Sequence, residues 1–259
     1  MESEIASYLR RYEGSLESLY TWTFDPAIPA ERFGIVVEGN SWLERTKDLR
    51  RKLFDRVQQA DSQEELVAIA EYFIQVWGGI GRFGRAKDVV NKFALLVNTT
   101  EYPADFPMKF DSISSWSKWA ALVCPAWACI YDARVAYSLN AINLMYGSKH
   151  KIFIAPPGRN SRITLLDATT LLVASKLTSL ADSSPKSIRK AYFVPKSETY
   201  IHYLRLMKKG SVLLFDDPSR FHEVEMLLFA IADTDIYSDL VGFVAKQNER
   251  VRGAESTEF

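Results

Sequence analysis

The fold of this chain is decided by residues 111–136, which read DSISSWSKWAALVCPAWACIYDARVA. Twenty residues separate Asp111 from Asp132, and Lys118 is the only charged residue among them. Charged residues make up 25% of the chain, so about five would be expected in a stretch of this length. A segment this apolar is expected to be buried. It predicts two core helices, the first containing Lys118 and the second following a turn at Pro125.

Apolar residues recur at helical spacing through most of the remaining sequence, which predicts a mainly α fold with at most a few short strands. We expect one unit over residues 1–259, with possible lobes at 1–100 and 101–259. Loops are expected at 24–40 and 99–107, and residues 151–155 could form a short strand. The further predicted helices cover residues 5–19, 41–60, 61–77, 85–98, 164–181, 197–209 and 221–232. Ser41 is expected to cap the helix over 41–60, and Asp61 with Glu64 to form a capping box at the start of the next one.

Composition excludes several classes of protein. The 259 residues carry 32 Lys and Arg and 32 Asp and Glu, so the formal net charge is zero. No stretch approaches the roughly 20 apolar residues of a membrane span, and the acidic N-terminus has no signal-like apolar region, so we expect a cytoplasmic protein without a membrane partner. Two cysteines and three scattered histidines argue against a disulfide scaffold and against a metal site. We expect neither a metal nor a cofactor.

Lys118 is the first candidate for chemistry. Its sequence neighbours include Trp116, Trp119 and the four small or aliphatic residues that follow, at 120–123. Burial lowers the pKa of a lysine, and the unprotonated amine is a good nucleophile. The alternative is a lysine that simply extends from a helix to water.

Asp132 is the second candidate. Val135, Leu139 and Ile142 follow it at helical spacing, which places Asp132 at the apolar edge of a helix start. A carboxylate fixed there can stabilise a developing cation. The alternative is an Asp that only caps the helix and meets its dipole.

Three parts of this segment together resemble the core of the helix-hairpin-helix DNA glycosylases: residues 115–120 (Ser-Trp-Ser-Lys118-Trp-Ala), the proline that follows, and residues 130–135 (Ile-Tyr-Asp132-Ala-Arg-Val). The chain is most similar to the bacterial 8-oxoguanine-DNA-glycosylase-like proteins. Residues 225–230 (EMLLFA) resemble the closing helix of that group. In this family the hairpin is usually rich in glycine, whereas serines stand here, and the spacing of 14 residues from Lys118 to Asp132 is shorter than usual.

The resemblance implies a two-lobed, glycosylase-like helical fold with a modified helix-hairpin-helix at its centre. It implies that Lys118 is a nucleophile and Asp132 its electrostatic partner, in an enzyme that flips a modified base out of DNA and excises it. Such an enzyme could serve repair or defence against phage with modified DNA. Candidate DNA contacts are Ser115, Ser117 and Arg134, and candidate base-stacking residues are Trp116 and Trp77.

Other patterns leave alternatives open. Residues 77–82 (WGGIGR) are a competing candidate for the hairpin, because they are rich in glycine. They could contact DNA or merely join two helices. If Lys118 and Asp132 are only structural, the chain is a non-catalytic helical module that binds DNA or protein. A cluster of basic residues could form a phosphate-binding face or a solvated surface: Arg159, Arg162, Lys186, Arg189, Lys190 and Lys196.

Overall fold

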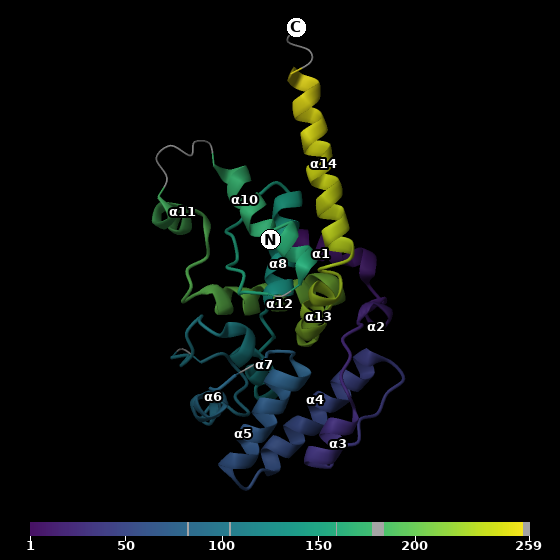
Figure 1. The fold of residues 1–259 in the computed structure, drawn as a ribbon, viewed down its shortest axis with the longest axis vertical. Helices are drawn as coiled ribbons and strands as arrows, with labels where there is room; N and C mark the ends of the chain where they lie inside the picture. Colours follow the sequence, from purple (N-terminus) through teal and green to yellow (C-terminus); the bar gives the residue numbers. More distant parts are fainter. Residues whose placement is uncertain (82, 104, 159, 178–183, 256–259) are drawn as a thin grey trace.

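The computed structural model describes residues 1–81, 83–103, 105–158, 160–177 and 184–255, and this part of the chain is mainly helical (Figure 1). The predicted α class is therefore confirmed. The strand expected at 151–155 is reduced to an isolated parallel bridge between Ile152 and Phe193. The α-helices are α1 (Glu2–Leu9), α2 (Leu16–Leu19), α3 (Ala27–Phe33), α4 (Trp42–Gln59), α5 (Gln63–Glu71), α6 (Ala86–Phe93), α7 (Ile113–Val123), α8 (Ala133–Met145), α9 (Ser161–Leu165), α10 (Ala168–Lys176), α11 (Pro185–Tyr192), α12 (Thr199–Phe215), α13 (Phe221–Ala230) and α14 (Asp235–Glu255).

Residues 111–136 contain α7 and the start of α8, and both helices belong to the core. Ten of the 11 residues of α7 and ten of the 13 residues of α8 are buried. A helix that is apolar on every side must be covered on every side. α8 accordingly contacts α1, α10, α13 and α14, while α7 contacts α4 and α6. The predicted pair of core helices is confirmed.

The helices are arranged in two groups, which Figure 1 shows above and below α7. The lower group consists of α3, α4, α5 and α6, and the upper group gathers α1, α10, α12 and α13 around α8. The C-terminal half of α14 projects away from the upper group (Figure 1). α7 and the loop to α8 therefore connect the two groups. Whether they correspond to the lobes of a glycosylase stays a prediction.

Several expected boundaries were wrong. The first helix is split, because Gly14 takes a left-handed conformation (φ +79°) between α1 and α2. Residues 24–40 contain α3 within the expected loop, and α11 and α14 were not expected at all. Ser41 caps α4 as predicted, accepting the amide of Glu44 at 3.2 Å. At α5 the capping residue is Ser62 and not Asp61.

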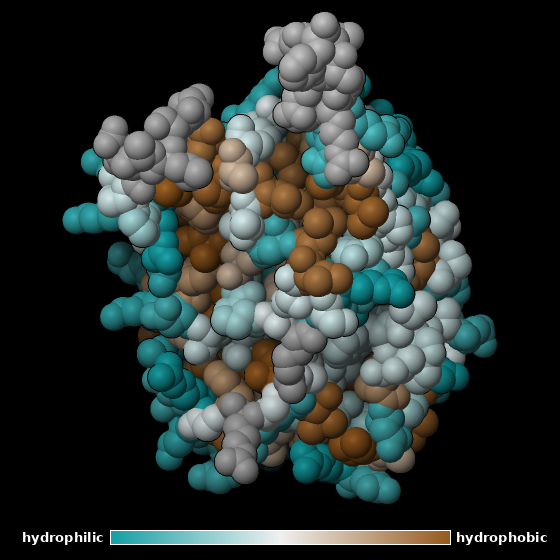
Figure 2. Space-filling view, turned by 45° about the horizontal axis from the view of Figure 1, so that its top comes forward, coloured by the Kyte–Doolittle hydropathy of each residue, from teal (hydrophilic) through white to brown (hydrophobic). Residues whose placement is uncertain are grey.

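The surface mixes hydrophilic and apolar residues. Figure 2 shows apolar residues reaching one face in several patches between hydrophilic side chains. Large exposed apolar side chains come from separate parts of the chain, as is normal for folded proteins: Val36, Val76, Leu95, Tyr146, Leu165, Val212, Leu213 and Val241. Within the described residues, no helix has the length and apolar character needed to cross a bilayer.

Candidate active site

A cavity of about 1520 Å³ opens beside the N-terminal ends of α7 and α8. Its walls come from distant parts of the sequence, including residues 78–80, 110–115 and 154–158. Both Lys118 and Asp132 line it, so folding brings the two predicted residues to one cavity. Aromatic side chains also line it, namely Trp22, Phe110, Phe193 and Phe229.

Lys118 lies in the middle of α7 and is only 6% exposed. Its Nζ donates a hydrogen bond to the carbonyl oxygen of Ser114, one turn earlier, at 2.9 Å. No ion pair joins Lys118 to an acid within the described part of the chain. Burial lowers the pKa of Lys118, and the nearby charges of Asp132 and Glu225 oppose that shift. The side chain therefore has the environment that favours a neutral, nucleophilic amine.

Gly78 gives Lys118 its place. A Cβ on Gly78 would lie 2.5 Å from Cδ and 2.6 Å from Cε of Lys118. The methylene chain of the lysine thus crosses directly over the backbone of the turn after residues 72–77, which form a π-helical turn. Gly78, which belongs to the glycine-rich run at 77–82, therefore supports the lysine, a role that its local sequence did not reveal.

Asp132 precedes the first turn of α8 and is half-buried. Its Oδ1 accepts the backbone amide of Val135 at 3.0 Å, so Asp132 is the N-cap of α8. The capping interpretation is therefore correct, and it does not compete with the functional one. One oxygen holds the helix end while the carboxylate still lines the cavity.

Glu225 is a third ionisable group close to Lys118 and Asp132, although it does not line the cavity, and its importance was not recognised from the sequence. It lies on α13, is 3% exposed, and its Oε2 has no hydrogen-bond partner among the described residues. Burial raises the pKa of Glu225 to about 8; Asp132 adds to this shift, while Arg50 and Lys118 oppose it. The available signal was the one that identified Lys118, a lone charge in the apolar run 224–232.

The serines before Lys118 occupy different environments. Ser115 lines the cavity, as does Ser112, which takes a left-handed conformation (φ +63°) of the kind that glycine adopts easily. Ser117 is fully buried instead. Its hydroxyl accepts the amide of Tyr131 at 3.0 Å and so joins α7 to the segment before Asp132. The expected DNA contact by Ser117 is corrected, because the side chain is inside the protein.

Arg134 lines the cavity, as a DNA-binding candidate should. Its Nη2 lies 2.8 Å from Oδ2 of Asp233, and its guanidinium lies over the ring of Phe229, 4.8 Å from the centroid. These contacts hold the side chain at the cavity wall. Its charge is partly balanced by Asp233, so Arg134 offers oriented hydrogen bonds more than free positive charge.

The two tryptophans expected to stack on a base lie in the core and do not line the cavity. Trp116 is 1% exposed and donates its Nε1 to the carbonyl of Lys109 at 2.9 Å. Trp77 is 4% exposed and stacks on Phe73 with centroids 4.3 Å apart. A buried ring has no free face for a ligand. The structure offers Trp22 instead, whose Nε1 donates to the carbonyl of Trp77.

Part of the basic cluster reaches the cavity. Arg189 and Lys190 on α11 and Lys196 after it line the mouth, whereas Lys186 does not. Arg162 instead donates to the carbonyl of Asp233 at 2.9 Å. Arg159 lies outside the described residues. Among the described residues that line the cavity, cations outnumber acids even though Lys196 pairs with Asp111 at 3.6 Å, which suits an anionic ligand.

Comparison with known proteins identifies no relative: no family model, no curated protein and no solved structure matches this chain. The site therefore has to be interpreted from its own geometry.

Proposed function

We propose that this protein is a DNA glycosylase that excises a modified base. The observation that carries the proposal is the pairing of a buried lysine with a carboxylate at a helix start, both on the wall of one large cavity. Ligand pockets usually measure roughly 300–1,000 Å³, so this cavity has room for a flipped nucleotide. The resemblance of residues 111–136 to the helix-hairpin-helix glycosylases points to the same chemistry.

The chemistry follows from the two side chains. The nucleotide is rotated out of the duplex so that its sugar lies beside Lys118 and Asp132. The Asp132 carboxylate stabilises the positive charge that develops on the sugar. The neutral amine of Lys118 forms a bond to the anomeric carbon as the bond from that carbon to the base breaks. The base leaves with the electron pair of that bond and takes up a proton, and the amine nitrogen loses one. Opening of the sugar ring then gives a Schiff base, which permits strand cleavage.

The test uses borohydride, which reduces a Schiff base to a stable bond. The protein is incubated with duplex DNA containing oxidised, alkylated or glucosylated bases, and both base release and covalent protein–DNA adducts are measured. Wild-type protein is expected to give an adduct on at least one substrate, Lys118→Gln none, and Asp132→Asn a strongly reduced amount. The substrate that responds also separates repair of host DNA from defence against phage with modified DNA.

Lys176→Gln is the matched control. Lys176 is half-buried, and burial lowers its pKa as it does for Lys118, but Lys176 does not line the cavity. Its replacement should leave the adduct unchanged. Equal activity in wild type, Lys118→Gln and Asp132→Asn would refute the proposal. Base release without any adduct would assign the attack to water and remove Lys118 from the nucleophile role.

A non-catalytic binding module is the second candidate. It is favoured by the observation that each key side chain already has a structural partner, Ser114 for Lys118 and Val135 for Asp132. A module of this kind would bind DNA or protein without releasing any base. Binding that survives in both variants, with no base release from any substrate, would favour it.

A further inference from the structure

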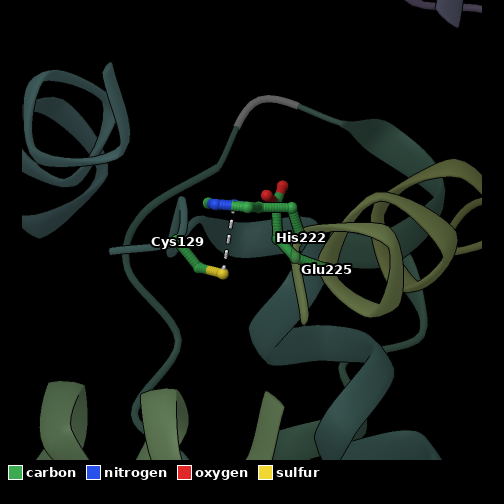
Figure 3. Close-up of side chains that lie close together, drawn as sticks. All are labelled: Cys129, His222 and Glu225. Carbon is green, nitrogen blue, oxygen red and sulfur yellow. Dashed lines mark hydrogen bonds between the residues drawn. The ribbon is translucent and has the colours of Figure 1, made fainter. Parts of the chain in front are cut away.

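Three potential metal ligands lie close together where the loop between α7 and α8 meets α13. Cys129 comes from the loop between α7 and α8, and His222 and Glu225 come from the first turns of α13 (Figure 3). One ligand atom from each, the thiol sulfur, a ring nitrogen and a carboxylate oxygen, all lie within 4.8 Å of one another. None of the three has a role in the proposed base excision.

The hydrogen bonds of His222 leave one ring nitrogen free to bind a metal. Nε2 lies 2.8 Å from the carbonyl oxygen of Pro125. A carbonyl only accepts, so Nε2 carries the proton and Nδ1 of the neutral ring presents its lone pair. Nδ1 faces Sγ of Cys129 at 3.7 Å (Figure 3). A histidine that donates one N–H to a carbonyl and directs its other nitrogen at the site is the usual arrangement of a metal ligand.

The distance between the Cys129 sulfur and the His222 nitrogen suits a tetrahedral ion. With zinc bonds of about 2.3 Å to sulfur and about 2.0–2.1 Å to nitrogen, the two ligand atoms of a tetrahedral site lie roughly 3.6 Å apart. The observed 3.7 Å is close to this value. The Cys129 sulfur and the His222 nitrogen are thus already placed for a shared ion.

Glu225 provides an independent indication. It is 3% exposed, and its Oε2 has no partner in the described part of the chain. A buried carboxylate oxygen without a partner is costly, and it calls for an ion or a bound proton. Cys129 is fully buried as well, and its thiol makes long contacts, 3.7 Å to His222 and 3.9 Å to the carbonyl of Phe221. A dication would give both groups a strong partner.

We propose that Cys129, His222 and Glu225 bind one Zn²⁺. A thiolate and an imidazole select zinc over magnesium or calcium, which prefer oxygen ligands. The carbonyl of Phe221 or a water molecule would complete the tetrahedron. The ion would join the loop before Asp132 to α13 and so fix the entry to α8. The sequence argued against a metal because its histidines are scattered, and folding brings His222 to a cysteine 93 residues away.

The test measures metal binding directly and needs no catalytic activity. Purified full-length protein is stripped with a chelator, reloaded with Zn²⁺ and analysed for bound metal by mass spectrometry. In parallel it is loaded with Co²⁺, which gives a thiolate-to-metal charge-transfer absorption when a cysteine is bound. The wild type is expected to bind one ion per chain and to show the band. Cys129→Ser is expected to lose the band, and His222→Gln to bind the metal at least about tenfold more weakly.

Cys124→Ser is the matched control, because Cys124 is the other buried thiol of the same segment and contacts the carbonyl of Leu96 instead. It should keep both the stoichiometry and the band. The wild-type measurement stands even if a variant fails to fold. Less than one ion per chain, absence of the band in wild type, or equal binding by Cys129→Ser and wild type would overturn the proposal.

Discussion

The side chain of Lys118 is positioned by a residue that has no side chain of its own. Gly78 leaves the space through which the lysine runs, and any Cβ there would overlap Cδ and Cε of Lys118 and also the backbone carbonyl oxygen of Ile74, 2.6 Å away. We expect Gly78→Ala to displace the amine and to reduce base excision by at least about tenfold, since a small misplacement of a reacting group is costly. Overpacking should also lower the free energy of unfolding by about 1–3 kcal/mol.

Single-turnover base release and urea unfolding measure these two effects. Gly84→Ala is the control, because a Cβ at Gly84 meets no atom within 4 Å. If Gly78→Ala retained full activity on a confirmed substrate, the position of the lysine over this turn would have no part in catalysis.

Protonation of Lys118 should also change the free energy of unfolding with pH. Burial lowers its folded pKa below the ordinary 10.5, so between these two values the unfolded chain binds more protons than the folded one. The free energy of unfolding should therefore rise with pH through this window and level off above 10.5. In Lys118→Met this rise should disappear, and the variant should be more stable than wild type below the window.

Urea unfolding at a series of pH values, with chelator present, measures this contribution. Lys87→Met, at an exposed position of α6, is the control and should keep the wild-type pH dependence. A rise of equal size in Lys118→Met would mean that another group is responsible for it.

At the scale of elements, Asp132 caps α8 and, in the proposed function, also supplies the carboxylate for base excision. Asn caps helices about as well as Asp, whereas Ala does not. We therefore expect Asp132→Asn to keep the wild-type stability but lose base excision. Asp132→Ala should lose excision and also about 0.5–2 kcal/mol of stability. Thermal unfolding and base release together separate the two requirements. Full excision by Asp132→Asn would leave the carboxylate with the capping role alone.

How far the sequence could predict these elements depended on where the information lies. α7, α8 and the cap of α4 follow from local patterns, because burial on all sides and a capping serine are written in neighbouring residues. α14 was missed because its fully buried side chains in the described part of the chain, Ile236 and Leu240, both lie near its start, so its apolar pattern is brief. The break after α1 depends on the left-handed conformation of Gly14, and the sequence alone does not predict it because a single glycine can also lie within a continuous helix.

The residues of the candidate site also differ in whether their sequence neighbours reveal them. Lys118 and Asp132 were found because each is unusual among its sequence neighbours. Gly78 and the cluster of Cys129 with His222 were not, because their importance arises only when the turn after residue 77 packs against α7 and when α13 meets the α7–α8 loop. Ser117 was misassigned for a related reason. Its sequence neighbours suggest a phosphate-binding hairpin, whereas its position in α7 turns it toward Tyr131.

At the scale of the whole molecule, a net charge of zero means that attraction to DNA has to come from one face. Arg189 and Lys190 line the cavity mouth, and neither has an acidic partner among the described residues. If they contact phosphates, each contributes about 0.9 to the slope of log K against log salt concentration. We expect Arg189→Ala/Lys190→Ala to weaken duplex binding and to reduce this slope by about 1–2.

Fluorescence anisotropy with labelled duplex at several salt concentrations measures the slope. The control is Lys246→Ala/Arg250→Ala, which removes the same charge from exposed positions of α14 that do not line the cavity. Both double variants change the net charge equally, so a general electrostatic effect would lower the slope in both. A loss confined to the α11 variant would place the phosphates at the cavity mouth, beside Lys118 and Asp132, because of the two pairs only Arg189 and Lys190 line the cavity that one nucleotide of the duplex must enter.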